Sequence, residues 1–154
     1  MCLICNRIDL IKNHQNPYFV KELETGYVVI GDNQHFRGYT LFLSKIHVRE
    51  PYDLEPTIMT KHLQEMAMVS RAVSLAFNAE KMNIESLGNG DAHLHWHLFP
   101  RKSGDLNHHG MAGKGPVWWL PAEEMYAEKT RPNTQELEQL KCSLKNALES
   151  PKRP

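Results

Sequence analysis

Apolar and polar residues alternate along several short stretches of the chain, which is the pattern of half-buried β-strands. The alternation predicts a hairpin whose two strands are separated by a Thr-Gly pair, and three further strands; the five ranges are Tyr18–Glu24, Tyr27–Ile30, Tyr39–Ser44, Met82–Leu87 and Leu94–Pro100. From Thr57 to Phe77 the apolar residues recur every three or four positions, which predicts one long helix, and Pro56 suits its first turn. Five strands packed on one long helix make an α+β domain.

A different pattern follows the last strand. Large apolar residues cluster at Pro116–Leu120, where core packing or a subunit interface is favoured over base stacking, and a helical pattern runs over Ala122–Lys129. Beyond Pro132 a leucine stripe at helical spacing is headed by Asn133 and Glu136, which suit an N-terminal cap. We therefore expect a C-terminal helical segment that completes a single domain over residues 1–149, with a frayed tail over residues 150–154.

Composition narrows the class of protein. The chain has 154 residues, 41% of them hydrophobic, with 18 basic and 18 acidic side chains. Zero net charge argues against a nonspecific partner such as nucleic acid or a membrane surface, so we expect a small-molecule partner. Three cysteines, with no signal peptide or apolar span, indicate a cytoplasmic protein. Local donors for an anionic ligand follow the last strand; they are Arg101, Lys102, His108, His109 and Lys114.

Three histidines alternate with large apolar residues between His93 and Phe99. Alternate side chains of a strand share a face, so the imidazoles lie on one face and the apolar residues between them on the other. His93 and His97 are about 13 Å apart and cannot readily bind the same metal ion, so the three must divide their roles. Neutral imidazole can act as nucleophile, general acid or base, or metal ligand. An incidental row of histidines is the simpler alternative, which strict alternation disfavours.

A second chemical signal is the pair Cys2 and Cys5, whose C-x-x-C spacing is that of two thiol ligands of zinc. Taken alone the pair is equally compatible with a redox couple or with buried thiols. Cys142 stands apart on the predicted C-terminal helix, where we expect an ordinary thiol.

The stretch His93–Phe99 resembles the signature of the histidine triad superfamily of nucleotide hydrolases and transferases, His-φ-His-φ-His-φ-φ with φ apolar. Gly38–His47 is similar to the strand Gly-His-x-Leu-Val-Ile-Pro-Lys-x-His of that family, so the resemblance covers roughly residues 1 to 101. It implies a five-stranded antiparallel sheet, a homodimer joined edge to edge, and hydrolysis of a dinucleoside polyphosphate, such as diadenosine tetraphosphate, or of a nucleotidyl phosphoramidate.

The same resemblance implies roles for individual residues. His95 would attack the α-phosphorus and form a covalent nucleotidyl-histidine, which water then hydrolyses. His97 would contact the bridging oxygen or the leaving group; a transferase branch carries Gln there, so histidine favours hydrolysis.

The zinc-bearing branch of the superfamily implies the ligands that the cysteine pair lacks. They resemble His47 and His93, which with Cys2 and Cys5 would form a closed tetrahedral and therefore structural site for Zn²⁺.

The chain departs from the family pattern at the site itself. Tyr39 stands where many members have a fourth histidine; its hydroxyl could replace the imidazole as a hydrogen-bond partner but is a poor base. The usual Gly-Gln-Ser/Thr run before the triad is absent, and Asn89 and Gly90 are the residues we expect to contact phosphate, with a plain turn as the alternative. Asp32, or the neighbouring Asn33, is expected to bind ribose hydroxyls.

Two other functions remain open. A regulatory protein that binds nucleotides with little turnover would keep the fold but lose activity through Tyr39. A metallohydrolase that binds its metal through the His-x-His pair would need acidic ligands close by, and Asp91 is the only such residue.

Overall fold

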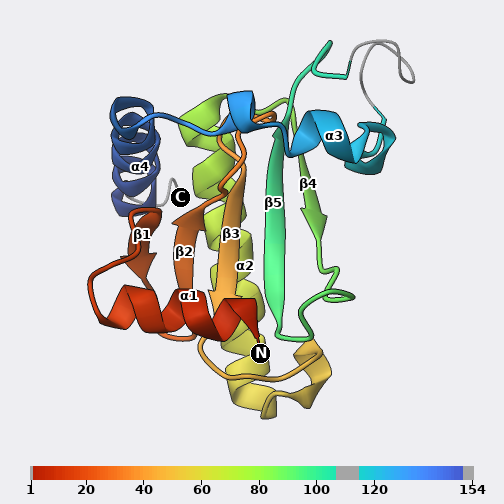
Figure 1. The fold of residues 1–154 in the computed structure, drawn as a ribbon. Helices are drawn as coiled ribbons and strands as arrows, with labels where there is room; N and C mark the ends of the chain where they lie inside the picture. Colours follow the sequence, from red (N-terminus) through yellow and green to blue (C-terminus); the bar gives the residue numbers. More distant parts are fainter. Residues whose placement is uncertain (1, 107–114, 151–154) are drawn as a thin grey trace.

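Residues 2–106 and 115–150 are described by the structure, a computed structural model, and they form a five-stranded sheet flanked by helices (Figure 1). The strand order is β1-β2-β3-β5-β4, and every neighbouring pair is antiparallel. The strands are β1 (Phe19–Glu22), β2 (Gly26–Ile30), β3 (Thr40–Ser44), β4 (Lys81–Glu85) and β5 (His95–Arg101). The α+β fold and all five strands predicted from the sequence are thus confirmed, with strand ends that differ from the predicted ones by at most two residues.

Helices cover both faces of this sheet. Helix α1 (Leu3–Lys12) lies across one face, while α2 (Pro56–Phe77) runs behind the other and α4 (Thr134–Glu149) packs against α2 and β1 (Figure 1). The predicted long helix is α2, and Pro56 occupies its first turn as expected. Helix α4 begins with the predicted capping box of Asn133 and Glu136.

Two predictions about helices were wrong. Helix α1 was not expected, although Ile4, Ile8 and Ile11 have the spacing of a buried helical face and are all buried. The expected helix over Ala122–Lys129 is divided into a short α3 (Ala122–Met125) and a 3₁₀ turn (Glu128–Thr130).

The sheet separates two hydrophobic cores. One lies between α1 and the sheet face that carries Tyr27, Val29, Leu41 and Leu43, and the other lies between α2, α4 and the opposite face. In the β3–β5 pairing, Leu43 is opposite His95 and Leu41 is opposite His97. Since paired residues of a sheet share a face, both histidines lie on the α1 side.

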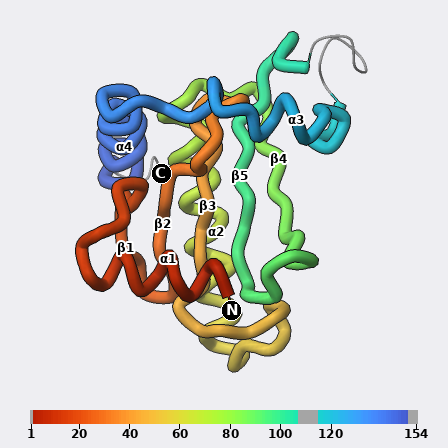
Figure 2. The backbone as a smooth tube through the Cα atoms, in the orientation of Figure 1, coloured from red at the N-terminus to blue at the C-terminus, as the bar shows by residue number. Residues whose placement is uncertain are grey.

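The described part of the chain after β5 packs on the α1 side of the sheet. Its 3₁₀ turn (Val117–Trp119) and α3 lie beside the β5 and β4 end of the sheet, far from α4 (Figure 2). Val117 and Leu120 join the α1-side core, as core packing of the apolar cluster predicts, but Trp118 is 72% exposed. The last four residues of the expected tail, 151–154, lie outside the described residues. None of the described helices is both long and apolar enough to cross a bilayer.

Candidate active site and metal centre

His95, at the start of β5, has one ring nitrogen fixed by the backbone. Its Nδ1 lies 2.6 Å from the carbonyl oxygen of His93. A carbonyl only accepts hydrogen bonds, so Nδ1 carries the proton, and in the neutral ring Nε2 keeps a free lone pair. Nε2 of His95 has no hydrogen-bond partner among the described residues. Every buried side-chain nitrogen or oxygen of these residues does have a partner, so Nε2 of His95 must be accessible to solvent. The geometry is that of an imidazole prepared for nucleophilic attack.

His97 lies two residues further along the same face and is held by a different partner. The hydroxyl of Tyr39 is 2.6 Å from Nδ1 of His97, and the Tyr39 ring stacks parallel to His97 and Phe99. The rings of His95 and His97 are 4.8 Å apart, centre to centre. One substrate atom can therefore reach both imidazoles.

Burial sets the protonation of this pair. Burial raises the pKa of the Tyr39 phenol above its ordinary value, so the phenol stays protonated. Burial, followed by the repulsion of a charged His95, lowers the pKa of His97 to about 4. In neutral His97 the phenol therefore donates to Nδ1, and the proton of the ring sits on Nε2. His95 and His97 thus offer Nε2 to a substrate in opposite states, one as a lone pair and one as a donor.

A cluster of four candidate metal ligands lies next to this site. One ligand atom from each of Cys2, Cys5, His47 and His93 lies within 4.8 Å of all the others. Sγ of Cys5 is 3.1 Å from Nδ1 of His47 and 3.4 Å from Nδ1 of His93, and Sγ of Cys2 is 3.6 Å from the latter. Tetrahedral zinc, with Zn–S of about 2.3 Å and Zn–N of about 2.0 Å, would set these separations near 3.5 Å. The four residues therefore fit a zinc ion.

Local structure explains why these ligands converge. Cys2 caps α1 and Cys5 lies one turn later, so both sulfur atoms are on one side of the helix, where each lies close to Nδ1 of His93. The N-terminal end of α1 is beside the start of β5 (Figure 1). Asp91 reinforces this contact by accepting a hydrogen bond from the backbone N–H of Leu3 at 2.9 Å. Nε2 of His93 lies 2.8 Å from the carbonyl of Ser44, which leaves Nδ1 of His93 for the metal. Burial lowers the pKa of His93, and a neutral ring is the form that binds metal.

The residue expected to bind ribose has another partner in this structure. Both carboxylate oxygens of Asp32 accept hydrogen bonds from the guanidinium of Arg7 on α1, one of them at 2.8 Å. This bond to Asp32 raises the pKa of Arg7. Asn33 instead donates to the hydroxyl of Thr130 at 2.9 Å. A ribose could reach the Asp32 carboxylate only by displacing Arg7, a contact that the sequence did not predict.

Other residues singled out in the sequence lie at the edge of the site or away from it. Asn89 and Gly90 are exposed in the loop between β4 and β5, where they make no polar contact with another described residue. Arg101, expected as a phosphate donor, is only 5% exposed and is bound to Asp105, Asn83 and the carbonyl of Gly115. Lys102 is exposed after the end of β5, and the candidates His108, His109 and Lys114 lie outside the described residues.

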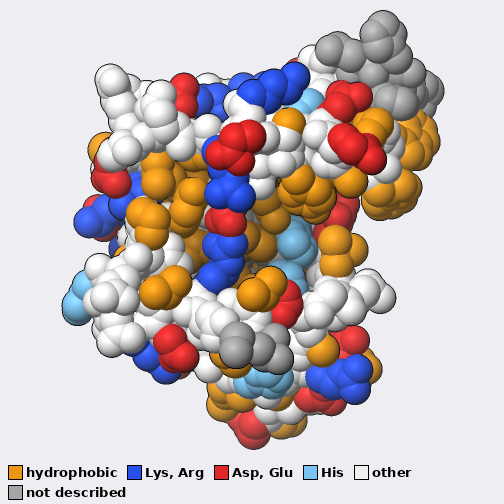
Figure 3. Space-filling model, viewed as in Figure 1, with side chains coloured by type: hydrophobic (Ala, Val, Ile, Leu, Met, Phe, Trp, Pro, Cys, Tyr) orange, Lys and Arg blue, Asp and Glu red, His pale blue; other side chains and the backbone are white. Residues whose placement is uncertain are grey.

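The surface beside His97 is hollowed by a cavity. In Figure 3 histidine side chains lie in a hollow of the face in view, bordered by hydrophobic side chains. His95 and His97 are not part of the cysteine-containing cluster, which is the candidate metal site among the described residues. A metallohydrolase based on the His-x-His pair therefore gains no support from the geometry.

Comparisons with known proteins agree with this arrangement. The family model described as HIT domain matches residues 14–104. Among solved structures, a histidine triad protein from Sinorhizobium meliloti has a TM-score of 0.69 at 20% identity, covering 87% of this chain and 93% of its own. One from Marinobacter aquaeolei has a TM-score of 0.68 at 22% identity, covering 85% and 88%. A zinc-bound histidine triad family protein from Mycobacterium smegmatis has a TM-score of 0.61 at 18% identity, covering 94% of both chains. No curated protein matched the sequence.

Proposed function

This chain belongs to the HIT domain family, and on that basis we propose that it is a nucleotide hydrolase that acts at the α-phosphorus through a nucleotidyl intermediate on His95. The substrate is a dinucleoside polyphosphate, such as diadenosine tetraphosphate, or a nucleotidyl phosphoramidate. The observation that carries the proposal is the hydrogen bond from Nδ1 of His95 to the carbonyl of His93, which leaves Nε2 as a nucleophile.

The neighbouring groups suit the two steps of such a reaction. Nε2 of His95 forms a bond to phosphorus while the bond from phosphorus to the leaving atom breaks, and Nε2–H of His97 donates to that atom. A bound phosphate is negative and favours protonation of His97; the Tyr39 hydroxyl can then accept from Nδ1, so Nε2 keeps its proton in both charge states. Water then attacks phosphorus and gives a proton to Nε2 of His97, which lost its own in the first step, while the bond from phosphorus to Nε2 of His95 breaks, so that the mononucleotide leaves and both histidines return to their starting states.

The direct test is to incubate the protein with diadenosine tetraphosphate and with adenosine 5′-phosphoramidate and to follow AMP by chromatography. We expect AMP from the wild type and none from His95→Ala. His14→Asn, which changes an exposed histidine remote from the triad strand, is the matched control and should keep wild-type activity. Equal activity of the wild type and His95→Ala would refute the assignment of the nucleophile.

We also propose that Cys2, Cys5, His47 and His93 hold Zn²⁺. Four protein ligands leave no open position, so the ion would link α1 to the start of the catalytic strand and take no part in the reaction. Support comes from the separations of the ligand atoms and from the hydrogen bond that orients His93. Thiolate ligands require a reducing compartment, which supports a cytoplasmic location.

A homodimer joined edge to edge is the assembly we propose. Strand β4 is at an edge of the sheet, and Ile84 on it and Leu87 just after it are exposed. An edge strand with apolar side chains invites pairing with a second chain. Light scattering after size-exclusion chromatography would return the mass of two chains, and a mass of one chain would refute this assembly.

A second function is favoured by one observation, the replacement of a family histidine by Tyr39. If the phenol cannot support proton transfer, the protein binds nucleotides without turning them over. Calorimetric binding of AMP together with no AMP release from either substrate would identify this regulatory function.

A further inference from the structure

Three basic side chains meet at a cavity away from the triad. The cavity has a volume of about 310 Å³ and lies between the loop that joins β2 to β3 and the segment that leads into α4. Arg37 lines it from the loop, and Lys129 and Arg131 line it from the other segment. Because the family model ends at residue 104, the matched HIT domain supplies only one of the two walls.

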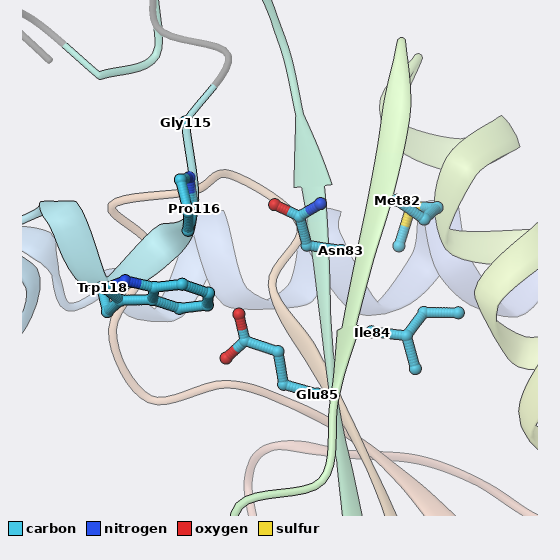
Figure 4. A pocket seen from close by; sticks show the side chains of 7 residues that line it. All are labelled: Met82, Asn83, Ile84, Glu85, Gly115, Pro116 and Trp118. Atoms are coloured by element: carbon cyan, nitrogen blue, oxygen red, sulfur yellow. The ribbon is translucent and has the colours of Figure 1, made fainter. Parts of the chain in front are cut away.

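This basic cavity is separate from the catalytic surface. Among the described residues, none lines both this cavity and the one beside His97. A third cavity, of about 380 Å³, lies beside the edge strand β4, between Asn83, Glu85 and the ring of Trp118 (Figure 4). That edge is the one that joins the two chains of the proposed dimer. A ligand of the basic cavity would therefore leave both the triad and the dimer edge free.

Hydrogen bonds hold the two walls of the basic cavity together. The backbone N–H of Gln34 donates to the carbonyl of Thr130 at 2.7 Å, which joins the loop to the segment before α4. The side-chain amide of Gln34 also closes its own loop. It donates to the carbonyls of Gly31 and Tyr39, at 2.8 and 2.9 Å, and accepts from the N–H of Gly38 at 2.8 Å. The walls are thus fixed before a ligand binds, which lowers the entropy cost of binding.

The basic side chains of this lining are largely available to a ligand. Arg37 and Lys129 are exposed and form no ion pair with another described residue. Arg131 pairs with Glu128 at 3.2 Å, but the side chain of this glutamate is 88% exposed, so the pair is weak. Glu136 is the one acidic residue of the described lining, and its carboxylate already accepts a hydrogen bond from the backbone at the N-cap of α4.

The balance of charges indicates which kind of ligand fits. Three positive side chains and one negative side chain leave an excess of two positive charges in the lining. Figure 3 shows Lys and Arg side chains gathered at the end of the molecule where α4 begins in Figure 1. A cleft lined by charges of one sign concentrates counter-ions. A phosphate group on a single ester bond carries about −1.5 to −2 charges at neutral pH, which matches this excess.

We propose that the basic cavity binds a phosphate monoester at a site separate from the triad. The guanidinium groups of Arg37 and Arg131 hold the phosphate oxygens, since a guanidinium can pair with two of them at once, and Lys129 adds a third positive charge. The volume is near the lower end of the range for small-molecule sites, about 300–1,000 Å³, so the cavity accepts a small ester rather than an acidic peptide. The group recognised is the terminal phosphate, which inorganic phosphate and AMP both carry.

The test follows the backbone amide signals of Gln34 and Thr130 by NMR while inorganic phosphate or AMP is added to the isotope-labelled protein. These two residues lie on opposite walls of the cavity, and neither is substituted in the variants below. We expect saturable shifts of both signals with both compounds, and weaker binding as NaCl is added, because salt screens exposed charges. Tighter binding of AMP than of phosphate would indicate that the nucleoside is also held, and equal binding that the phosphate alone is recognised.

Two double variants separate this site from general attraction of anions. Arg37→Gln with Lys129→Gln should weaken binding of AMP at these two signals by about five- to thirtyfold, since one exposed charge pair contributes up to about fivefold. Arg71→Gln with Lys145→Gln removes the same net charge from exposed positions on α2 and α4 outside the cavity. This matched control should keep the affinity of the wild type to within about twofold, because distant exposed charges are screened.

Three results would overturn the proposal. The first is an absence of saturable shifts at Gln34 and Thr130 with either compound, including the case in which only signals of the triad strand move. The second is an unchanged affinity in Arg37→Gln with Lys129→Gln. The third is an equal loss in the matched control, because the lowered net charge would then explain both. None of these results depends on the hydrolase activity, because the described lining contains no residue of the triad strand.

Discussion

Removing the Tyr39 hydroxyl tests whether this group takes over the role of the fourth histidine that many members of the family have at this position. In Tyr39→Phe the ring keeps its stacking on Phe99, but Nδ1 of His97 loses the hydroxyl at 2.6 Å. A hydrogen bond of this kind contributes about 0.5–1.5 kcal/mol, and a buried acceptor left without a partner costs about 1–3 kcal/mol. Tyr39 is buried, so we expect the free energy of unfolding to fall by about 1–3 kcal/mol.

The effect on catalysis follows from the proton of His97. Without the phenol nothing holds the proton of neutral His97 on Nε2, so the group that meets the leaving atom is less often a donor. We expect kcat to fall about tenfold, which corresponds to about 1.4 kcal/mol in the activation free energy. The loss should be larger for adenosine 5′-phosphoramidate, whose amine needs a proton, than for diadenosine tetraphosphate, whose phosphate leaves as a stable anion.

Two variants complete this experiment. Tyr27→Phe changes another buried tyrosine, one whose hydroxyl has no described hydrogen-bond partner, and should retain wild-type kcat on both substrates. Tyr39→His restores a donor and acceptor and should recover kcat to within about threefold of the wild type. The role of Tyr39 in positioning His97 is refuted if Tyr39→Phe keeps full activity, or if its losses on the two substrates are equal.

The structure supports three more predictions. Cys5→Ser should reduce bound zinc, measured by mass spectrometry of the metal, from one ion per chain to well below one, while His95→Ala keeps it; equal zinc contents would exclude Cys5 as a ligand. Arg7→Met should free the Asp32 carboxylate and lower KM for the nucleotide while costing about 1–2 kcal/mol of stability; a KM that does not change would argue against ribose binding by Asp32. Burial lowers the pKa of both His62 and His97 to about 4, so the unfolded chain binds more protons than the folded one as pH falls from 6.5 towards 4. The free energy of unfolding, measured with denaturant, should therefore fall as the pH is lowered, by up to about 1.4 kcal/mol per pH unit for each histidine. In His62→Gln the contribution of His62 to this pH dependence should be missing, which leaves that of His97.

Much of the fold could be predicted because its signals are local. Alternation over 18–24 and 39–44 and the helical period over 57–77 each lie within one element and determine its type. Helix α1 has the same kind of signal in Ile4, Ile8 and Ile11, but Cys2 at its N-cap and Cys5 in its first turn also match the spacing of a metal-binding pair, and that pattern by itself does not predict a helix. The helix and the candidate metal site depend on each other, since the start of the helix brings both sulfur atoms to one side.

The site could be predicted only in part, because its contacts join distant segments. The alternation places the three histidines on one face, the C-x-x-C spacing indicates Cys2 and Cys5, and the resemblance implies His47 and His93 as the other ligands. That the Tyr39 hydroxyl meets His97 depends on the register of β3 against β5, where Leu41 is opposite His97. The ion pair between Arg7 and Asp32 depends on how α1 crosses the sheet, and no local pattern specifies that angle.

Hydrogen bonds on the far face of β5 hold the strand that carries the histidines in place. Trp96, between His95 and His97, donates from its indole N–H to Nε2 of His62 at 3.0 Å. Nδ1 of His62 therefore carries the proton of that neutral ring and donates to the hydroxyl of Thr25 at 2.9 Å, which in turn donates to Glu65 at 2.6 Å. This chain of hydrogen bonds, buried beyond His62, ties β5 to α2 and to the β1–β2 turn, while the candidate metal ligands lie at the other end of the triad. Because protonating His62 removes the acceptor of the indole N–H, acid should loosen the strand that carries both histidines at the same pH at which it destabilises the fold.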